Sequence, residues 1–102
     1  MKPTFHRYFI KAYIKLPKNI QLKVKACLRL FEKNPFSKEF NNHSLQGRYK
    51  NHRSINITGD YRAIYQPIDE TMVMFVVLGG PLSTLWIKPN SGRHGNEIKN
   101  VL

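Results

Sequence analysis

The hydrophobic period of the sequence changes once, near residue 53, and the change divides the chain into a helical part and a sheet part. Before it, apolar residues recur at spacings of three and four, in stripes that end at Leu16 and Phe31. After it, Ile55 and Ile57 alternate with polar residues, as in a strand with one buried face. Helices followed by strands predict an α+β domain.

The two apolar stripes predict two amphipathic helices. Their members are Phe5, Phe9, Ala12, Tyr13 and Leu16 in the first stripe, and Ile20, Val24, Cys27, Leu28 and Phe31 in the second. Pro17 separates the helices, because the residue before a proline avoids the α region, and Asn34 with Pro35 ends the second. Since the link is so short, we expect an antiparallel helical pair.

Strands are predicted from residue 53 onward. Two half-buried strands, residues 53–58 and 61–66, are separated by a tight turn at Gly59 and Asp60. After a further turn, the segment MVMFVVL (72–78) is apolar on both faces, and we expect it to be the central strand. GGP ends it, and LSTLWI is expected to form a last short strand. The sheet should therefore be small, mainly antiparallel and twisted, with one face packed on the helices and the other concave, solvated and basic.

The length of 102 residues fits one domain, which we assign to residues 1–87. Residues 88–102 are rich in Lys, Pro, Asn, Ser and Gly and are expected to form a flexible tail. Residues 35–52 are expected to be a polar connection that bends at Gly47. The single cysteine, Cys27, is expected to be a small core residue. The four histidines are scattered, so no metal site or cofactor is expected.

The charge balance is strongly basic. Lys and Arg number 17 against 6 Asp and Glu, which gives a formal net charge of +11. Such a field attracts polyanions, namely nucleic acid, an acidic protein or an anionic membrane surface, and the alternative is a basic protein without such a partner. Because the N-terminus has no long apolar run, we expect neither a signal peptide nor a membrane span, and a cytoplasmic location.

The stretch HSLQGRYKNHRSINITGDYRAIYQ, residues 43–66, gathers cations around one acid, Asp60. Its cationic residues are Arg48, Lys50, Arg53 and Arg62. Arginine suits a phosphate because its planar fork donates two parallel hydrogen bonds. We therefore expect Arg62 to bind a phosphate, with Arg53 as second choice, and Arg48 and Lys50 to bind a nucleic-acid backbone. The alternative for Arg62 is a solvated strand arginine.

The order of LPKNIQLKVKACLRLFEKNPF, the stretch 43–66 and an apolar strand ending in Gly resembles the RelE/ParE toxin superfamily, and most of all its RelE and YafQ-like branch. The resemblance covers about residues 5–80. It implies the RelE-like fold and a metal-independent endoribonuclease that cuts mRNA in the ribosomal A site. The implied partners are mRNA, rRNA and a cognate acidic antitoxin. The ParE branch instead inhibits DNA gyrase, so a toxin that acts by binding alone is the alternative.

Three site residues follow from the resemblance. His43 matches a catalytic histidine in the H-x-L-x-G motif of YafQ-like toxins, and the alternative is a loop histidine that caps a backbone group. Asp60 matches a functional aspartate, and the alternatives are ordinary turn chemistry or ion pairs that orient Arg53 and Arg62. Tyr61 matches an aromatic residue of the site, where it would stack on an RNA base, or else it belongs to the core.

The sequence departs from the family pattern at two places. Asn56 stands where YafQ-like toxins have a histidine, and an amide cannot transfer a proton. After the apolar strand the family usually has G-T-H-S-x-L followed by Tyr or Phe, and its histidine is often the proton donor. Here GGPLSTLW contains no histidine, and Trp86 replaces the terminal aromatic residue one position later. Three alternatives follow: another group donates the proton, with His94 in the tail as a distant substitute; cleavage is slow and needs the ribosome; or the chain no longer cuts RNA.

Overall fold

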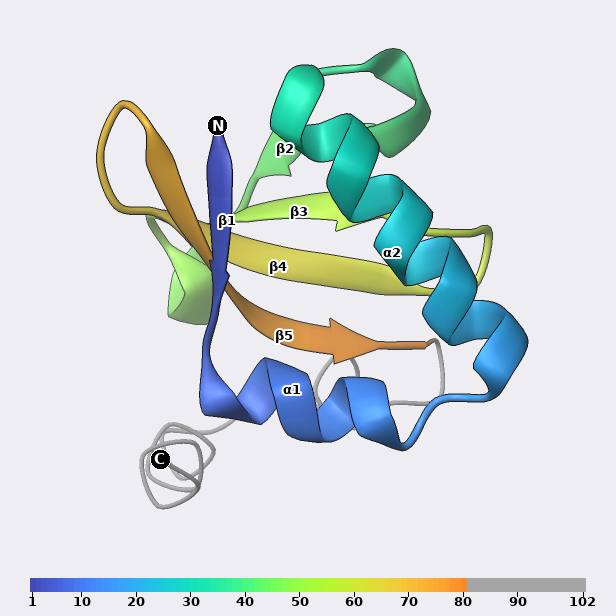
Figure 1. Cartoon of the computed structure of the whole chain (residues 1–102). Helices are drawn as coiled ribbons and strands as arrows, with labels where there is room; N and C mark the ends of the chain where they lie inside the picture. The colour runs from blue at the N-terminus through green and yellow to red at the C-terminus, as the bar shows by residue number, and fades with distance from the viewer. Residues whose placement is uncertain (81–102) are drawn as a thin grey trace.

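The computed structural model describes residues 1–80, in which two helices cover one face of a five-stranded sheet (Figure 1). The helices are α1 (Arg7–Ile14) and α2 (Lys18–Lys33). The strands are β1 (Lys2–Phe5), β2 (His43–Ser44), β3 (Arg53–Asn56), β4 (Arg62–Pro67) and β5 (Met72–Gly79). Two short 3-10 helices, η1 (Lys38–Phe40) and η2 (Gly47–Tyr49), precede β3. The predicted α+β class is confirmed.

The helices begin and end close to the predicted positions. α1 begins after His6, whose Nδ1 accepts a hydrogen bond of 3.0 Å from the Tyr8 N–H and so caps the helix. Pro17 is the N-cap of α2, and α2 ends at Lys33, one residue before Asn34. α1 lies along β5, and α2 turns back across the same face of the sheet (Figure 1).

The strand order is β1-β5-β4-β3-β2, and β1 pairs with β5 in parallel while the other neighbours are antiparallel. β1 was not predicted, and the assignment of Phe5 to the first helix was wrong, because Phe5 pairs with Phe75 in the sheet. β5 is an interior strand, as its two apolar faces indicated. The middle position, however, belongs to β4, since β1 covers the other edge of β5.

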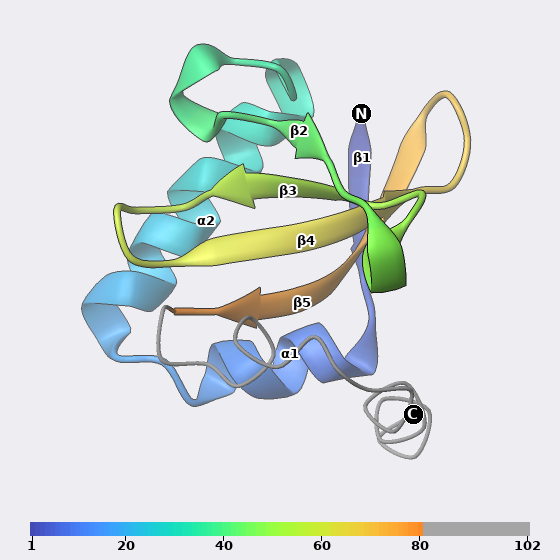
Figure 2. The same cartoon turned by 180° about the vertical axis from the view of Figure 1, so that it is seen from behind.

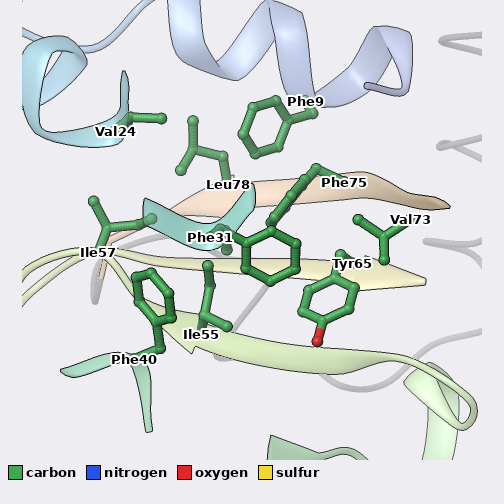
Figure 3. Close-up of a cluster of buried hydrophobic side chains, with 11 residues drawn as sticks. Phe9, Val24, Phe31, Phe40, Ile55, Ile57, Tyr65, Val73, Phe75 and Leu78 are labelled. Atoms are coloured by element: carbon green, nitrogen blue, oxygen red, sulfur yellow. The ribbon is translucent and has the colours of Figure 1, made fainter. Parts of the chain in front are cut away.

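The core lies between the helices and the sheet and is built around Phe31 of α2 (Figure 3). The Phe31 ring centroid lies 5.0 Å from that of Tyr65, 5.2 Å from that of Phe75 and 6.1 Å from that of Phe40. Phe40 is 1% exposed although it lies in the segment expected to be a polar connection. That expectation was wrong at η1, where one aromatic residue turns inward from a polar sequence. Cys27 is half-buried against this core, as expected.

Strand pairing assigns each residue to one face of the sheet, because directly paired residues point to the same side. The row Ile55, Ala63 and Leu78 belongs to the core. The next row, Ser54, Ile64 and Val77, therefore belongs to the face away from the helices, here called the outer face. These three residues are only 0–2% exposed. The expectation that the whole outer face is solvated was therefore wrong at its middle.

Three features expected from the sequence involve residues beyond position 80. The predicted strand LSTLWI, the end of the proposed domain at residue 87 and the tail 88–102 lie outside residues 1–80. Within residues 1–80, neither helix has the length and apolar character needed to cross a membrane.

Candidate functional site

His43 and Arg62 lie on the outer face of the sheet. His43 pairs with Ser54, which pairs with Ile64, so all three share this face. Arg62 is two residues before Ile64 and therefore points to the same side. Strands about 4.8 Å apart and a rise of about 3.4 Å per residue place the Cα atoms of His43 and Arg62 roughly 12 Å apart. At that separation the two side chains are able to approach one phosphodiester from opposite sides.

The His43 ring has a defined orientation. Its Nδ1 lies 2.7 Å from the carbonyl oxygen of Asn41, which only accepts hydrogen bonds. The neutral ring is therefore assigned its proton on Nδ1, and the lone pair of Nε2 is left for another partner. His43 is exposed on an edge strand. Nδ1 of His43 thus makes the backbone contact expected of a capping histidine. Nε2 is left able to accept a proton, as a catalytic base requires.

Arg62 is exposed at the start of β4 and lies between two neutral neighbours. It pairs with Asn56 on β3 and with Gly79 on β5. Gly79 contributes no side chain and Asn56 contributes an uncharged amide, so neither strand partner neutralises the guanidinium. This arrangement suits an arginine that binds an anion from solution.

Asp60 lies in the exposed turn between β3 and β4, two residues before Arg62. The turn is held by Thr58, whose hydroxyl oxygen accepts hydrogen bonds of 3.1 Å from the N–H groups of both Asp60 and Tyr61. Because Thr58 supplies this turn chemistry, the carboxylate of Asp60 is not required to hold the turn. The side chain is therefore available for another role.

Tyr61 is half-buried and packs against the core cluster. Its ring also lies beside the end of β5, since a Cβ atom added to Gly80 would be 3.2 Å from Tyr61 Cε2. Only part of the ring is therefore open to a base. The other tyrosine on this segment, Tyr65, is 2% exposed and is a core residue.

Arg53 differs from Arg62 because it is committed to contacts within the protein. Its Nε donates a hydrogen bond of 2.7 Å to Asn42 Oδ1, and its Nη2 lies 3.4 Å from the Asn42 carbonyl oxygen. Its guanidinium carbon lies 5.2 Å from the centroid of the Phe36 ring, in a cation–π contact. Arg53 pairs with Tyr65 and therefore points to the helix side, not to the side of His43 and Arg62.

The connection between β2 and β3 carries Arg48 and Lys50. Figures 1 and 2 place η2, which contains Arg48, on the side of the sheet away from the helices. Lys50 is exposed, whereas one terminal nitrogen of Arg48 is buried. Tyr49 packs edge-on against His52 at 5.5 Å, and burial raises the pKa of its phenol, so Tyr49 is a neutral residue here.

Two features of the site were not predicted. The side chain of Asn42 forms hydrogen bonds with Arg53, Tyr65 and Pro35. The Tyr49 ring packs edge-on against the ring of His52. Asn42 had one sequence signal, its position directly before His43, but a single asparagine in a polar segment is most often a surface residue. Within residues 1–80, no three His, Cys, Asp or Glu side chains are grouped as metal ligands would be.

Comparisons with known proteins identify the family and the fold of the chain. A family model described as the bacterial toxin YafQ of type II toxin–antitoxin systems matches residues 1–81. No curated protein matches the sequence. Among solved structures, YafQ from E. coli strain BL21(DE3) is 22% identical, with a TM-score of 0.64 over 78% of this chain and 92% of that chain.

Two further solved structures share the fold. A YoeB/ParE toxin from Agrobacterium tumefaciens is 17% identical, with a TM-score of 0.65 over 78% of this chain and 98% of that chain. The toxin–antitoxin complex RelBE2 from Mycobacterium tuberculosis contains a chain that is 20% identical, with a TM-score of 0.67 over 80% of this chain and 92% of that chain. These likenesses confirm the RelE-like fold, and the match to most of the sequence shows that the chain belongs to the YafQ family of bacterial toxins of type II toxin–antitoxin systems.

Proposed function

We propose that this toxin is a ribosome-dependent mRNA endoribonuclease that inhibits translation in the cytoplasm. The observation that carries the proposal is that His43, a base on β2, and Arg62, a fixed cation on β4, lie on the same outer face of the sheet on either side of β3. RNA cleavage of this kind uses the 2′-hydroxyl of the substrate as nucleophile. The protein has only to remove a proton, stabilise the phosphate charge and help the 5′-oxygen leave.

Two of these tasks, proton removal and phosphate stabilisation, have a candidate side chain, whereas protonation of the leaving oxygen has none among the candidates. Nε2 of His43 accepts the proton of the 2′-hydroxyl, and the resulting oxyanion attacks the adjacent phosphorus. The guanidinium of Arg62 donates hydrogen bonds to the phosphate oxygens as their negative charge grows. The leaving 5′-oxygen then takes a proton, which Asn56 cannot provide. We therefore expect slow cleavage unless the ribosome positions the RNA.

The remaining candidates are proposed to bind rather than react. Lys50 is exposed and suits an RNA phosphate, whereas Arg48 contacts RNA only through its exposed part. The open part of the Tyr61 ring is proposed to stack on a base. Asp60 is proposed to act beside Arg62, and its effect should be smaller than that of His43 if it only orients its neighbours.

Translation of a defined mRNA in a purified system tests the proposal. We expect the wild-type toxin to generate new mRNA ends at the ribosomal A site. Replacing His43 by Gln should slow single-turnover cleavage by about 10²–10⁴-fold, because Gln hydrogen-bonds without accepting a proton. His52→Gln is the matched control and should cleave as the wild type does. Equal rates for wild type and His43→Gln would refute this base.

A second candidate function is inhibition of DNA gyrase by binding. The observation that favours it is the segment GGPLSTLW, residues 79–86, which lacks the histidine of the cleaving toxins. Gyrase supercoiling measured with the same preparation separates the two functions. Inhibition of supercoiling without new mRNA ends would favour the second function over the first.

An acidic antitoxin is the proposed protein partner, and the helices provide a surface for it. An open groove with a volume of about 250 Å³ is lined by Phe5, Phe9, Ile10, Tyr13, Lys25 and Leu28. One lining residue, Lys25, is cationic and exposed, and the two helices carry further exposed lysines, including Lys11 and Lys23. An amphipathic segment with apolar and acidic side chains would match both features.

Paired substitutions test this docking surface. Ile10 and Ile68 are similarly exposed, at 46% and 49%, but only Ile10 lines the groove. We expect Ile10→Glu to weaken the complex with the co-expressed antitoxin, measured by calorimetry, and Ile68→Glu to leave its affinity unchanged. Equal affinities for the two variants would place the antitoxin elsewhere.

A further inference from the structure

The side chain of Asn42 is the centre of a hydrogen-bond network directly beside His43. Its Nδ2 donates hydrogen bonds of 2.8 Å to the Pro35 carbonyl oxygen and to the Tyr65 hydroxyl. Its Oδ1 accepts a hydrogen bond of 2.7 Å from Arg53 Nε. The orientation of the amide follows from its partners, because a carbonyl only accepts and an arginine only donates. Both ends of the amide are therefore used.

The partners of Asn42 are themselves fixed. Tyr65 is 2% exposed, and its ring packs against those of Phe31 and Phe75 in the core. Arg53 is held over the ring of Phe36. Hydrogen bonds thus connect Asn42 to the core through Tyr65, to the segment after α2 through Pro35 and to β3 through Arg53. A residue with three such anchors has little freedom to move.

The strand that carries His43 has no comparable support of its own. β2 contains only two residues, lies at the edge of the sheet and pairs with β3 alone. Asn41, two residues before His43, has a φ of 46°, in the left-handed region, and its carbonyl oxygen is the partner of His43 Nδ1. The position of that carbonyl therefore depends on what holds the backbone between Asn41 and His43.

We propose that Asn42 is a positioning residue that fixes the Asn41 carbonyl and thereby holds the His43 ring in the tautomer with its proton on Nδ1. This leaves Nε2 as the ring nitrogen that meets RNA. The catalytic consequence rests on the proposed function, whereas the tautomer is a property of the free protein. Aspartate in place of Asn42 would keep the acceptor for Arg53 but lose both donors, to Pro35 and to Tyr65.

The tautomer is measured by long-range ¹H–¹⁵N NMR of the histidine rings of the full chain, at a pH where imidazole is neutral. In the wild type we expect His43 to carry its proton on Nδ1. In Asn42→Ala we expect the His43 signal to shift toward the Nε2-protonated form, which a free imidazole side chain prefers. Asn19→Ala, an exposed asparagine on α2, is the matched control and should leave the signal unchanged.

A milder variant guards against loss of folding. Tyr65→Phe keeps the ring in the core and removes only the hydroxyl that Asn42 binds. We expect the same shift of the His43 signal, smaller in size. An unchanged His43 tautomer in folded Asn42→Ala, or in Tyr65→Phe when Asn42→Ala does not fold, would overturn the proposal.

Cleavage on ribosomes supplies the second readout. At saturating ribosome concentration, a misplaced base should slow the chemical step of Asn42→Ala by up to about 10²-fold, without weakening binding. A shifted tautomer with no cleavage by any variant, wild type included, would refute the nuclease function and leave the positioning role standing. An unshifted tautomer with normal wild-type cleavage would refute the positioning role and leave the nuclease function standing.

Discussion

The helix-covered face of the sheet and the outer face are built from alternate residues of the same strands. On β4, Ala63 and Tyr65 point into the core, while Arg62 and Ile64 point outward. The core side is apolar and aromatic, and the outer side has polar and cationic residues around a buried middle. Because successive residues of a strand point to opposite faces, a shift of the strand register by one residue would move the core side chains to the outer face and the site side chains into the core.

This division separates packing from chemistry along each strand. A substitution on the core side changes mainly the free energy of unfolding, and one at the exposed part of the outer face changes mainly the reaction. Asn42 links the two, since it binds a core tyrosine on one side and precedes His43 on the other. Substitutions on each side, made in matched pairs, therefore test the comparison.

The largest effect is expected on the core side. Phe31→Ala removes a fully buried ring that contacts three other aromatic rings, and should lower the free energy of unfolding by about 3–5 kcal/mol. Leu22→Ala on the same helix is the control, because Leu22 is 56% exposed and should cost no more than about 0.5 kcal/mol. Denaturant titration measures both. Similar losses for the two variants would contradict the assigned core.

The next effect is expected at the exposed part of the outer face. Arg62→Ala removes a charge-assisted donor and should slow single-turnover cleavage by about 10²–10³-fold. Its free energy of unfolding should stay within about 0.5 kcal/mol of the wild type, since Arg62 is exposed. Arg29→Ala, an exposed arginine on α2, should change neither quantity. A cleavage rate unaffected by Arg62→Ala would remove Arg62 from the site.

A smaller effect tests whether the middle of the outer face is packed. Ile64→Val deletes one methyl group from a residue that is 1% exposed, and should cost about 0.5–1.5 kcal/mol of unfolding free energy. Ile68→Val, at 49% exposure, should cost almost nothing. If thermal and denaturant unfolding do not distinguish the two variants, the middle of the outer face is solvated, as the sequence had indicated.

The smallest effect concerns pH and the start of α1. Burial, together with the Arg7 guanidinium, lowers the pKa of His6 below its ordinary value of 6.5. The unfolded chain therefore takes up a proton at His6 before the folded protein does. The stability that neutral His6 contributes is complete above pH 6.5 and is lost as the pH falls below it, toward the lowered pKa.

The variant His6→Asn isolates this contribution, because asparagine caps a helix without titrating. Between about pH 7.5 and pH 5.5, across the range in which histidine titrates, the wild type should lose more unfolding free energy than His6→Asn. The other three histidines are common to both proteins and do not contribute to the difference. A larger loss in His6→Asn would reverse the sign and contradict the assigned cap.

Much of the fold was predictable because the signals were local. Pro17 and Pro35 marked the ends of helices, and Ile20 to Phe31 carried the stripe of α2. The turns before β4 and before β5 were predicted from their short polar segments, and each is closed by backbone hydrogen bonds. For the site, the sequence supplied His43 and Asp60 through a resemblance to known toxins, and Arg62 through the phosphate-binding chemistry of arginine. Their catalytic roles stay predictions.

Local pattern could not reveal contacts between distant segments. β1 pairs with β5 across about seventy residues, Lys2 with Met72, so four residues near the N-terminus become a strand only because β5 offers them an edge. β2 is two residues long and too short for any period to show. Phe40 is buried because η1 turns it onto Phe31, although its neighbours in sequence are polar.

The sequence by itself determined the two helices and the strands β3, β4 and β5, because those elements depend on spacing, proline and turn residues within a few positions. Tertiary structure alone decided which arginine is free for an anion. Arg53 and Arg62 both lie on strands of one cationic stretch, but pairing turns Arg53 toward Tyr65, where Asn42 and Phe36 hold it. Arg62 points to the outer face between Asn56 and Gly79. The physical reason is that a side chain's partners are set by strand register, which is fixed only when the whole sheet has formed.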